Sequence, residues 1–164
     1  MFLTHESFLR RVKELNSDYW NEGKYYRWDY MLVAIKMMED IGAADICEAG
    51  ASGMPLNDDS FLMDYPKFDL DKTPYKIDSF VIPDKIFDAF CALQTWEHLK
   101  EPVAAFSEVK RISKNCILSV PYKWKHGDAQ HQGIDINKIL EWTSGLSPDK
   151  SVIVKDRIVC LWRF

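Results

Sequence analysis

The residues best suited to bind a ligand lie in a short segment, Glu48-Ala49-Gly50-Ala51-Ser52-Gly53, called the glycine loop below. It ends the apolar run 44–49, which predicts a buried strand entering a turn. Glycine at positions 50 and 53 would let the backbone approach a ligand closely, and the Glu48 carboxylate can accept hydrogen bonds. Because Gly-x-x-Gly after a strand is common, this loop alone is weak evidence for a nucleotide-like ligand.

A longer run downstream strengthens the pattern. Its pieces, in order, are Phe87-Asp88, an apolar run, Glu97-His98-Leu99, Pro102, Glu108 to Arg111, and the strand-like 117–122 that ends in Val-Pro-Tyr. In order and spacing these pieces resemble the fourth strand, the next helix and the fifth strand of the S-adenosylmethionine-dependent methyltransferases (class I, type 11-like). The resemblance covers residues 44–122 of the chain.

The resemblance implies S-adenosylmethionine as the cofactor, and its contacts can be assigned residue by residue. The residues expected at the cofactor are Glu48, Gly50, Ser52, Gly53, Asp64, Asp71, Leu93 and Gln94. The glycine loop would hold the methionine end, and Asp64 would accept hydrogen bonds from both ribose hydroxyls. Leu93 and Gln94 would lie under the sulfonium. Asp71 matches the acid near the adenine amino group, with Asp69 as a close rival.

The sequence departs from the family pattern near this loop. Ser52 and Met54 stand where the family usually has further glycines, and only ten residues separate Gly53 from Asp64. A parallel crossover normally takes a dozen or more residues, so the first one has room for a turn or two of helix at most. The second, between Asp64 and Asp88, is rich in proline. We therefore expect an abbreviated member with a thinner cover on one face of its sheet, which a second copy in a homodimer could cover.

Two histidines are candidates for a general base toward a methyl acceptor. His126 and His131 belong to the polar, aromatic segment 122–134, on the side of the fold where ligands bind. Histidine has a pKa suited to proton removal near neutral pH, although an exposed polar loop explains the segment equally well. His98 is more simply interpreted as a residue at a helix start. A metal site from His126, Asp128 and His131 is disfavoured, so we expect no metal.

The surrounding elements indicate one α/β domain of 164 residues, with N-terminal helices in 1–42 and an α/β core in 43–164. Strands are predicted at 44–49, 61–63, 86–93, 116–120, 151–154 and 157–161, and helices at about 4–16, 28–41, 102–114 and 135–145. Their alternation predicts a doubly wound, mostly parallel, Rossmann-like sheet with a C-terminal antiparallel hairpin. The aromatic segment 19–28 is expected to dock the helices on the sheet, and Arg27 or Tyr26 could meet the cofactor's carboxylate.

Composition narrows the class of partner. A net charge of −4 without a basic block favours a small-molecule acceptor, and no nucleic acid is expected. No apolar run approaches the roughly 18 residues of a membrane span, and the N-terminus does not resemble a secretory leader, so we expect a cytoplasmic protein. The four cysteines form no Cys-x-x-Cys pair and lie in apolar runs, which favours buried thiols over a zinc site.

Methyl transfer from S-adenosylmethionine to a small-molecule acceptor is therefore the leading hypothesis. The alternative is a catalytically inactive methyltransferase-like module for binding or assembly, which the short crossovers and missing glycines favour. A nicotinamide-dependent dehydrogenase would need Gly-x-Gly-x-x-Gly opening a helix, and residues 54–57, Met-Pro-Leu-Asn, do not provide one.

Overall fold

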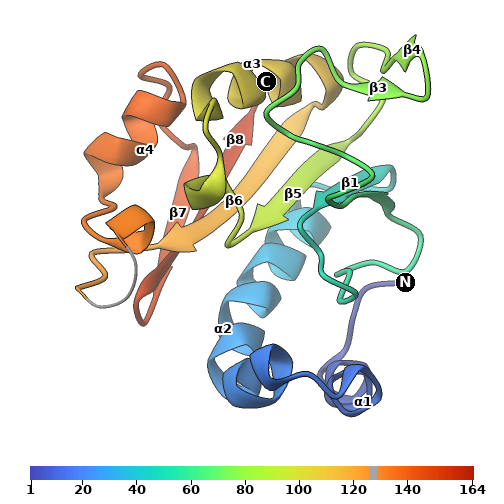
Figure 1. The fold of residues 1–164 in the computed structure, drawn as a ribbon, viewed down its shortest axis with the longest axis vertical. Helices are drawn as coiled ribbons and strands as arrows, with labels where there is room; N and C mark the ends of the chain where they lie inside the picture. The colour runs from blue at the N-terminus through green and yellow to red at the C-terminus, as the bar shows by residue number, and fades with distance from the viewer. Residues whose placement is uncertain (126–128) are drawn as a thin grey trace.

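A six-stranded sheet forms the centre of the computed structural model, which describes residues 1–125 and 129–164. The strands lie in the order β2-β1-β5-β6-β8-β7 (Figure 1). Their bounds are β1 Ile46–Ala49, β2 Phe61–Met63, β5 Ala89–Leu93, β6 Asn115–Pro121, β7 Lys150–Val154 and β8 Arg157–Arg163. β2, β1, β5 and β6 are parallel, whereas β8 runs antiparallel between β6 and β7. The predicted mostly parallel sheet with a C-terminal antiparallel hairpin is confirmed.

Helices cover both faces of this sheet (Figure 1). Their bounds are α1 His5–Leu15, α2 Asp18–Asp40, α3 Pro102–Ile112 and α4 Ile136–Trp142, with short 3-10 helices η1 Trp96–His98 and η2 Ala129–His131. Within β5, Ala89 and Cys91 belong to the apolar cluster under α1 and α2, whereas Phe90 and Ala92 belong to the cluster under α3 and α4. Because side chains alternate along a strand, the four inner strands β1, β5, β6 and β8 contribute to both cores.

The first two crossovers, both within the described residues, contain no helix. The chain passes from β1 to β2 through residues 50–60, and from β2 to β5 through residues 64–88. The longer crossover carries only a two-stranded ribbon, β3 Lys76–Ile77 and β4 Phe80–Val81. Its prolines lack the N–H group that a helix interior needs. The expected shortening is confirmed, and the first crossover does not form even one helical turn.

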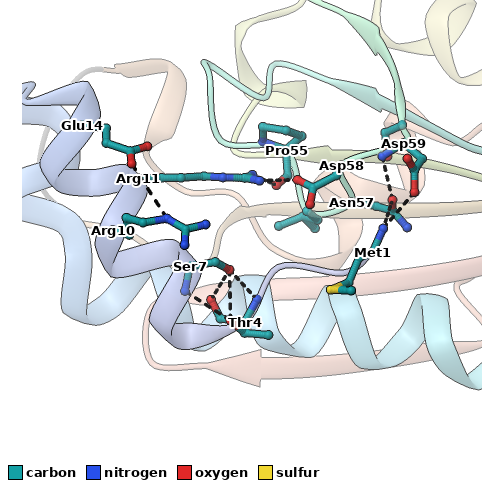
Figure 2. Close-up of polar contacts among 12 residues, drawn as sticks. Met1, Thr4, Ser7, Arg10, Arg11, Glu14, Pro55, Asn57, Asp58 and Asp59 are labelled. Carbon is teal, nitrogen blue, oxygen red and sulfur yellow. Dashed lines mark hydrogen bonds and ion pairs between the residues drawn. The ribbon is translucent and has the colours of Figure 1, made fainter.

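The N-terminal segment supports the first crossover where a helix would otherwise do so. Leu3 N donates to Leu56 O at 2.7 Å. From α1, Arg11 Nη1 donates to Pro55 O at 3.2 Å, and Arg11 Nη2 forms an ion pair with Asp58 (Figure 2). Buried or half-buried backbone groups need such partners, so a segment distant in sequence fixes the path of the crossover.

α2 begins at Asp18, well before the helix start predicted at Trp28. Ser17 caps it, because its side chain accepts a hydrogen bond from Trp20 N. The buried face of these first turns includes Gly23 and Arg27, and a Cβ at Gly23 would overlap the Arg27 side chain. The prediction was wrong here because a glycine and an arginine interrupt the apolar periodicity on which it depended.

The remaining boundaries are close to those predicted. The strand expected from residue 86 begins at Ala89, and Phe87 makes only an isolated bridge to Ser113. All four cysteines are free and buried in strands, as expected, and burial raises the pKa of each thiol. Within the two described ranges, no helix combines the length and the apolar character needed to cross a bilayer.

Candidate functional site

The glycine loop lies at the carboxyl end of β1, where the strand order reverses between β2 and β5. In doubly wound folds, ligands bind at such a switch point. Gly50 and Gly53 have φ angles of +69° and +80°, and Ser52 also has a positive φ of +51°. A Cβ at position 50 would overlap the Thr95 side-chain oxygen, just beyond β5. The loop thus keeps a left-handed backbone at Ser52, where the family usually has glycine.

Glu48 holds the first crossover against the end of β1. Its carboxylate accepts hydrogen bonds from Leu56 N at 2.8 Å, Asn57 N at 2.9 Å and Ser60 Oγ at 2.6 Å. Burial raises the pKa of Glu48, and these three donors partly offset that effect. This predicted cofactor residue therefore fixes the shape of the loop through internal contacts.

The acids predicted for the ribose and the adenine have different surroundings. Asp64 Oδ1 accepts a hydrogen bond from Ala51 N at 2.8 Å, which joins the end of β2 to the glycine loop. Asp71 Oδ1 accepts from the two backbone N–H groups at 100–101, at 2.9 and 2.8 Å, just before α3. Asp69 Oδ1 accepts from Asp71 N at 3.1 Å. These hydrogen bonds connect Asp64 to the glycine loop and Asp71 to the start of α3.

A narrow pocket lies between the glycine loop and the first turns of α2. Gly50 and Leu93 line it from the sheet, and Tyr19 and Trp20 line it from α2. Trp20 Nε1 donates to Ser52 O at 3.3 Å, which holds the helix on the loop. The pocket has a volume of about 30 Å³, enough for about two water molecules.

A larger open cleft of about 360 Å³ adjoins this pocket, and Tyr19 lines both. The other residues that line the cleft are Arg27, Gln94, Glu97, His98, Pro121, Trp124, His131 and Arg157. Gln94 is fixed by a hydrogen bond from its Nε2 to Ser119 Oγ at 2.9 Å. The cleft therefore brings together Gln94 and His131, two residues that the sequence assigned to the site.

Two buried arginines line this cleft. Arg27 Nη1 donates to Tyr19 OH at 2.8 Å, and its guanidinium lies 3.6 Å from the centre of the Tyr19 ring. Arg157 forms an ion pair with Asp156 at 2.9 Å and lies 4.5 Å from the centre of the Trp124 ring. Neither Nε has a hydrogen-bond partner among the described residues. Both Nε atoms are buried, and that of Arg27 packs against Gly23, so the two guanidinium groups contribute positive charge to the wall of the cleft.

Glu97 is the buried acid of the cleft. It is 7% exposed, and burial raises its pKa to about 7, although a backbone hydrogen bond and Arg157 act in the opposite direction. At neutral pH it is protonated in a large fraction of molecules, so it can give or take a proton. His98 and His131 lie beside it, with their Nε2 atoms 3.4 Å apart. The other predicted base, His126, lies outside the described residues.

No family model and no curated protein matches the chain, but solved structures do. A SAM-dependent methyltransferase from Aquifex aeolicus has a TM-score of 0.57 and 12% identity, with 93% of this chain and 96% of that one covered. The chain has the methyltransferase fold. The N-terminal domain of EvdMO1 with SAH bound has a TM-score of 0.55 at 16% identity, covering 99% and 98%. A structure described as a type 11 methyltransferase from Sulfolobus solfataricus has a TM-score of 0.52 at 18% identity, covering 73% and 83%.

In this methyltransferase fold, two residues of the cleft were missed from the sequence. Glu97 belongs to the Glu-His-Leu run, but nothing in that run indicates that its carboxyl is buried. Arg157 opens β8 and reaches the cleft because β8 pairs with β6, so that Arg157 lies opposite Pro121. No local signal could have found Arg157, because its place depends on the pairing of two strands.

Proposed function

We propose that this chain transfers a methyl group from S-adenosylmethionine to a small-molecule acceptor held in the cleft. The observation that carries the proposal is the hydrogen bond from Ala51 N to Asp64. This hydrogen bond holds Asp64, the acid proposed to bind the ribose, against the glycine loop at the switch point of the sheet, and a polar cleft of about 360 Å³ lies nearby. The EvdMO1 domain, which has the same fold, is described with SAH bound, and this supports the choice of cofactor.

The residues present fit the ribose part of the cofactor, because a carboxylate at Asp64 can accept from two vicinal hydroxyls. Glycine at position 50 lets the backbone of the loop pack directly against Thr95, which fills the space that a Cβ would need. Leu93 ends β5, and Gln94 follows it at the same edge of the sheet. Asp71 is proposed for the adenine end, with Asp69 as its rival. When bound, the cofactor would supply an electrophilic methyl group on its sulfonium.

The cleft residues would position the acceptor and remove its proton. Trp124 and Tyr19 offer aromatic faces, and the buried guanidinium groups of Arg27 and Arg157 favour an acceptor that carries a carboxylate or phosphate. His131 is the proposed general base. Much of the rate enhancement in such transfers comes from alignment in a water-poor site, so few residues need to react.

The second candidate function is a catalytically inactive binding or assembly module. The narrow pocket beneath Tyr19 and Trp20 favours it, because a space of about 30 Å³ is too small for the methionine end of the cofactor unless α2 shifts.

The homodimer and the cytoplasmic location remain predictions. The exposed Phe80 and Val81 of the β3–β4 ribbon are the place to test self-association.

Thermal melting with S-adenosylhomocysteine, S-adenosylmethionine or NAD separates these functions. A ligand at 100 times its Kd should add about 2.7 kcal/mol of stability. We expect a shift with the two adenosyl ligands and a smaller one in Asp64→Ala. No shift with millimolar S-adenosylhomocysteine would overturn the methyltransferase proposal, and a shift without methyl transfer to any acceptor tested would favour the inactive module.

A further inference from the structure

Three side chains that line the cleft bring potential metal-ligand atoms close together. We propose that Glu97, His98 and His131 form a binding site for a divalent transition metal ion. One ligand atom from each residue lies within 4.8 Å of the other two. Two imidazoles and one carboxylate are ligands suited to Zn²⁺, Co²⁺, Fe²⁺ or Mn²⁺, whereas Ca²⁺ and Mg²⁺ prefer oxygen.

The distance between the two imidazoles fits shared coordination. His98 Nε2 and His131 Nε2 are 3.4 Å apart, and the rings are nearly perpendicular at 80°. N–H hydrogen bonds in proteins usually span about 2.7–3.2 Å, so this contact is long for one. Two nitrogens bound tetrahedrally to one ion at about 2.1 Å would be separated by about 3.4 Å. The histidine pair therefore already has the spacing that a tetrahedral ion requires.

Glu97 supplies an independent indication. The side chain is 93% buried (7% exposed), and its Oε2 has no hydrogen-bond partner within the described part of the chain. An unpartnered carboxylate oxygen in a buried position is costly, and a bound cation would remove that cost. Arg157 is the nearby positive charge, and its ion pair with Asp156 at 2.9 Å partly neutralises it.

The site would connect two separate segments. Glu97 and His98 lie in η1, and His131 lies in η2, which contacts η1. Three protein ligands leave at least one coordination position for a water or an acceptor oxygen, as in catalytic zinc sites. With a metal ion bound, the His131 Nε2 lone pair is used in coordination, so the ion, in place of a free His131, would promote loss of the proton from an acceptor hydroxyl bound there. This acceptor role rests on the proposed methyltransferase function, whereas metal binding does not.

Titration of the metal-free protein with Co²⁺ tests the proposal. Coordination by two imidazoles and a carboxylate should give visible absorption bands stronger than those of aqueous Co²⁺, with one ion bound per chain. We expect each of three substitutions, His131→Ala, His98→Ala and Glu97→Gln, to lower the affinity for Co²⁺ at least tenfold. His5→Ala is the matched control, because His5 lies on α1 against Trp28, and it should bind as the unmodified protein does.

A competition with Zn²⁺ and a melting curve complete the test. Zn²⁺ should displace Co²⁺ and raise the melting temperature of the unmodified protein but not of His131→Ala. His131 is half-buried, in a 3-10 helix with no buried residue, so its replacement should leave the fold intact. Aqueous-type Co²⁺ spectra, or equal Co²⁺ affinity in His131→Ala, would overturn the proposal. Melting with S-adenosylhomocysteine in the presence of EDTA reports on the cofactor site separately, so failure of one proposal is distinguishable from failure of the other.

Discussion

Gly50 packs directly against Thr95, so the turn after β1 and the turn after β5 touch at the switch point of the sheet. A Cβ at position 50 would overlap Thr95 Oγ1 and lie 3.1 Å from Thr95 Cγ2. The φ of +69° adds a second penalty for any other residue. The contact couples the backbone of the glycine loop to the segment that carries Glu97 and His98.

Gly50→Ala should therefore lower the free energy of unfolding by about 2–3 kcal/mol, because the costs of backbone strain and of steric overlap add. It should also weaken the binding of S-adenosylhomocysteine. Gly145→Ala is the matched control: its φ is +82°, but a Cβ there meets nothing within 4 Å. Urea unfolding of the two variants separates the overlap from the backbone strain. Thr95→Ala should partly rescue Gly50→Ala. Equal losses at positions 50 and 145 would show that the contact with Thr95 contributes nothing.

Arg11→Ala should loosen the first crossover and lower the affinity for S-adenosylhomocysteine several-fold. The free energy of unfolding should fall by about 1 kcal/mol. Arg11 joins α1 to Pro55 O and Asp58, and no helix replaces these contacts. The neighbouring Arg10→Ala is the control, since among the described residues the ion pair of Arg10 is with Glu14 of its own helix (Figure 2). Calorimetric titration of both variants gives the comparison, and identical affinities would contradict the support proposed for the N-terminal segment.

Asp71→Ala should cost about 1–3 kcal/mol, because two backbone N–H groups before α3 would lose their acceptor. Asp69→Ala removes only the hydrogen bond from Asp71 N and an exposed ion pair with Lys72, so it should cost less. Measuring S-adenosylhomocysteine affinity beside stability decides which acid meets the adenine. A drop in affinity for Asp69→Ala alone would reverse the proposed assignment.

Asp88→Asn should give a pH-dependent loss of stability. Lys114, which forms an ion pair with Asp88 at 2.8 Å, and the N–H groups of Asp45 and Ala44 hold the pKa of Asp88 below its usual 3.8. A lowered pKa stabilises the folded state above pH 3.8, and that stability disappears as the pH falls through the lowered value. The difference from the unmodified protein should be about 2 kcal/mol near pH 7 and shrink toward zero in acid. Acid titrations followed by circular dichroism test this, with the exposed Asp78→Asn as control; a difference that persists at the lowest pH would contradict it.

The sequence alone was sufficient to predict the elements whose structure is decided by local residue pattern. The short apolar run 61–63 predicted a strand ending at Asp64, and β2 ends directly before it; the cofactor role of Asp64 came from the resemblance and stays a prediction. Asp71 was placed by resemblance alone, and its hydrogen bonds connect it to α3. The start of α2 was missed because Gly23 and Arg27 occupy its buried face. Where a position depends on a partner far along the chain, as with Arg157 beside β6, one sequence without its strand pairing cannot supply it.

The cover that Tyr19 and Trp20 form over the glycine loop has a kinetic consequence. Trp20 holds the first turns of α2 on Ser52 beside a pocket of about 30 Å³, so a ligand larger than this pocket would enter it only when those turns move away from Ser52. Observed binding rates should then level off as ligand concentration rises, at the rate of that opening. The same cover would slow escape, so the chain would exchange its ligand slowly at a given affinity.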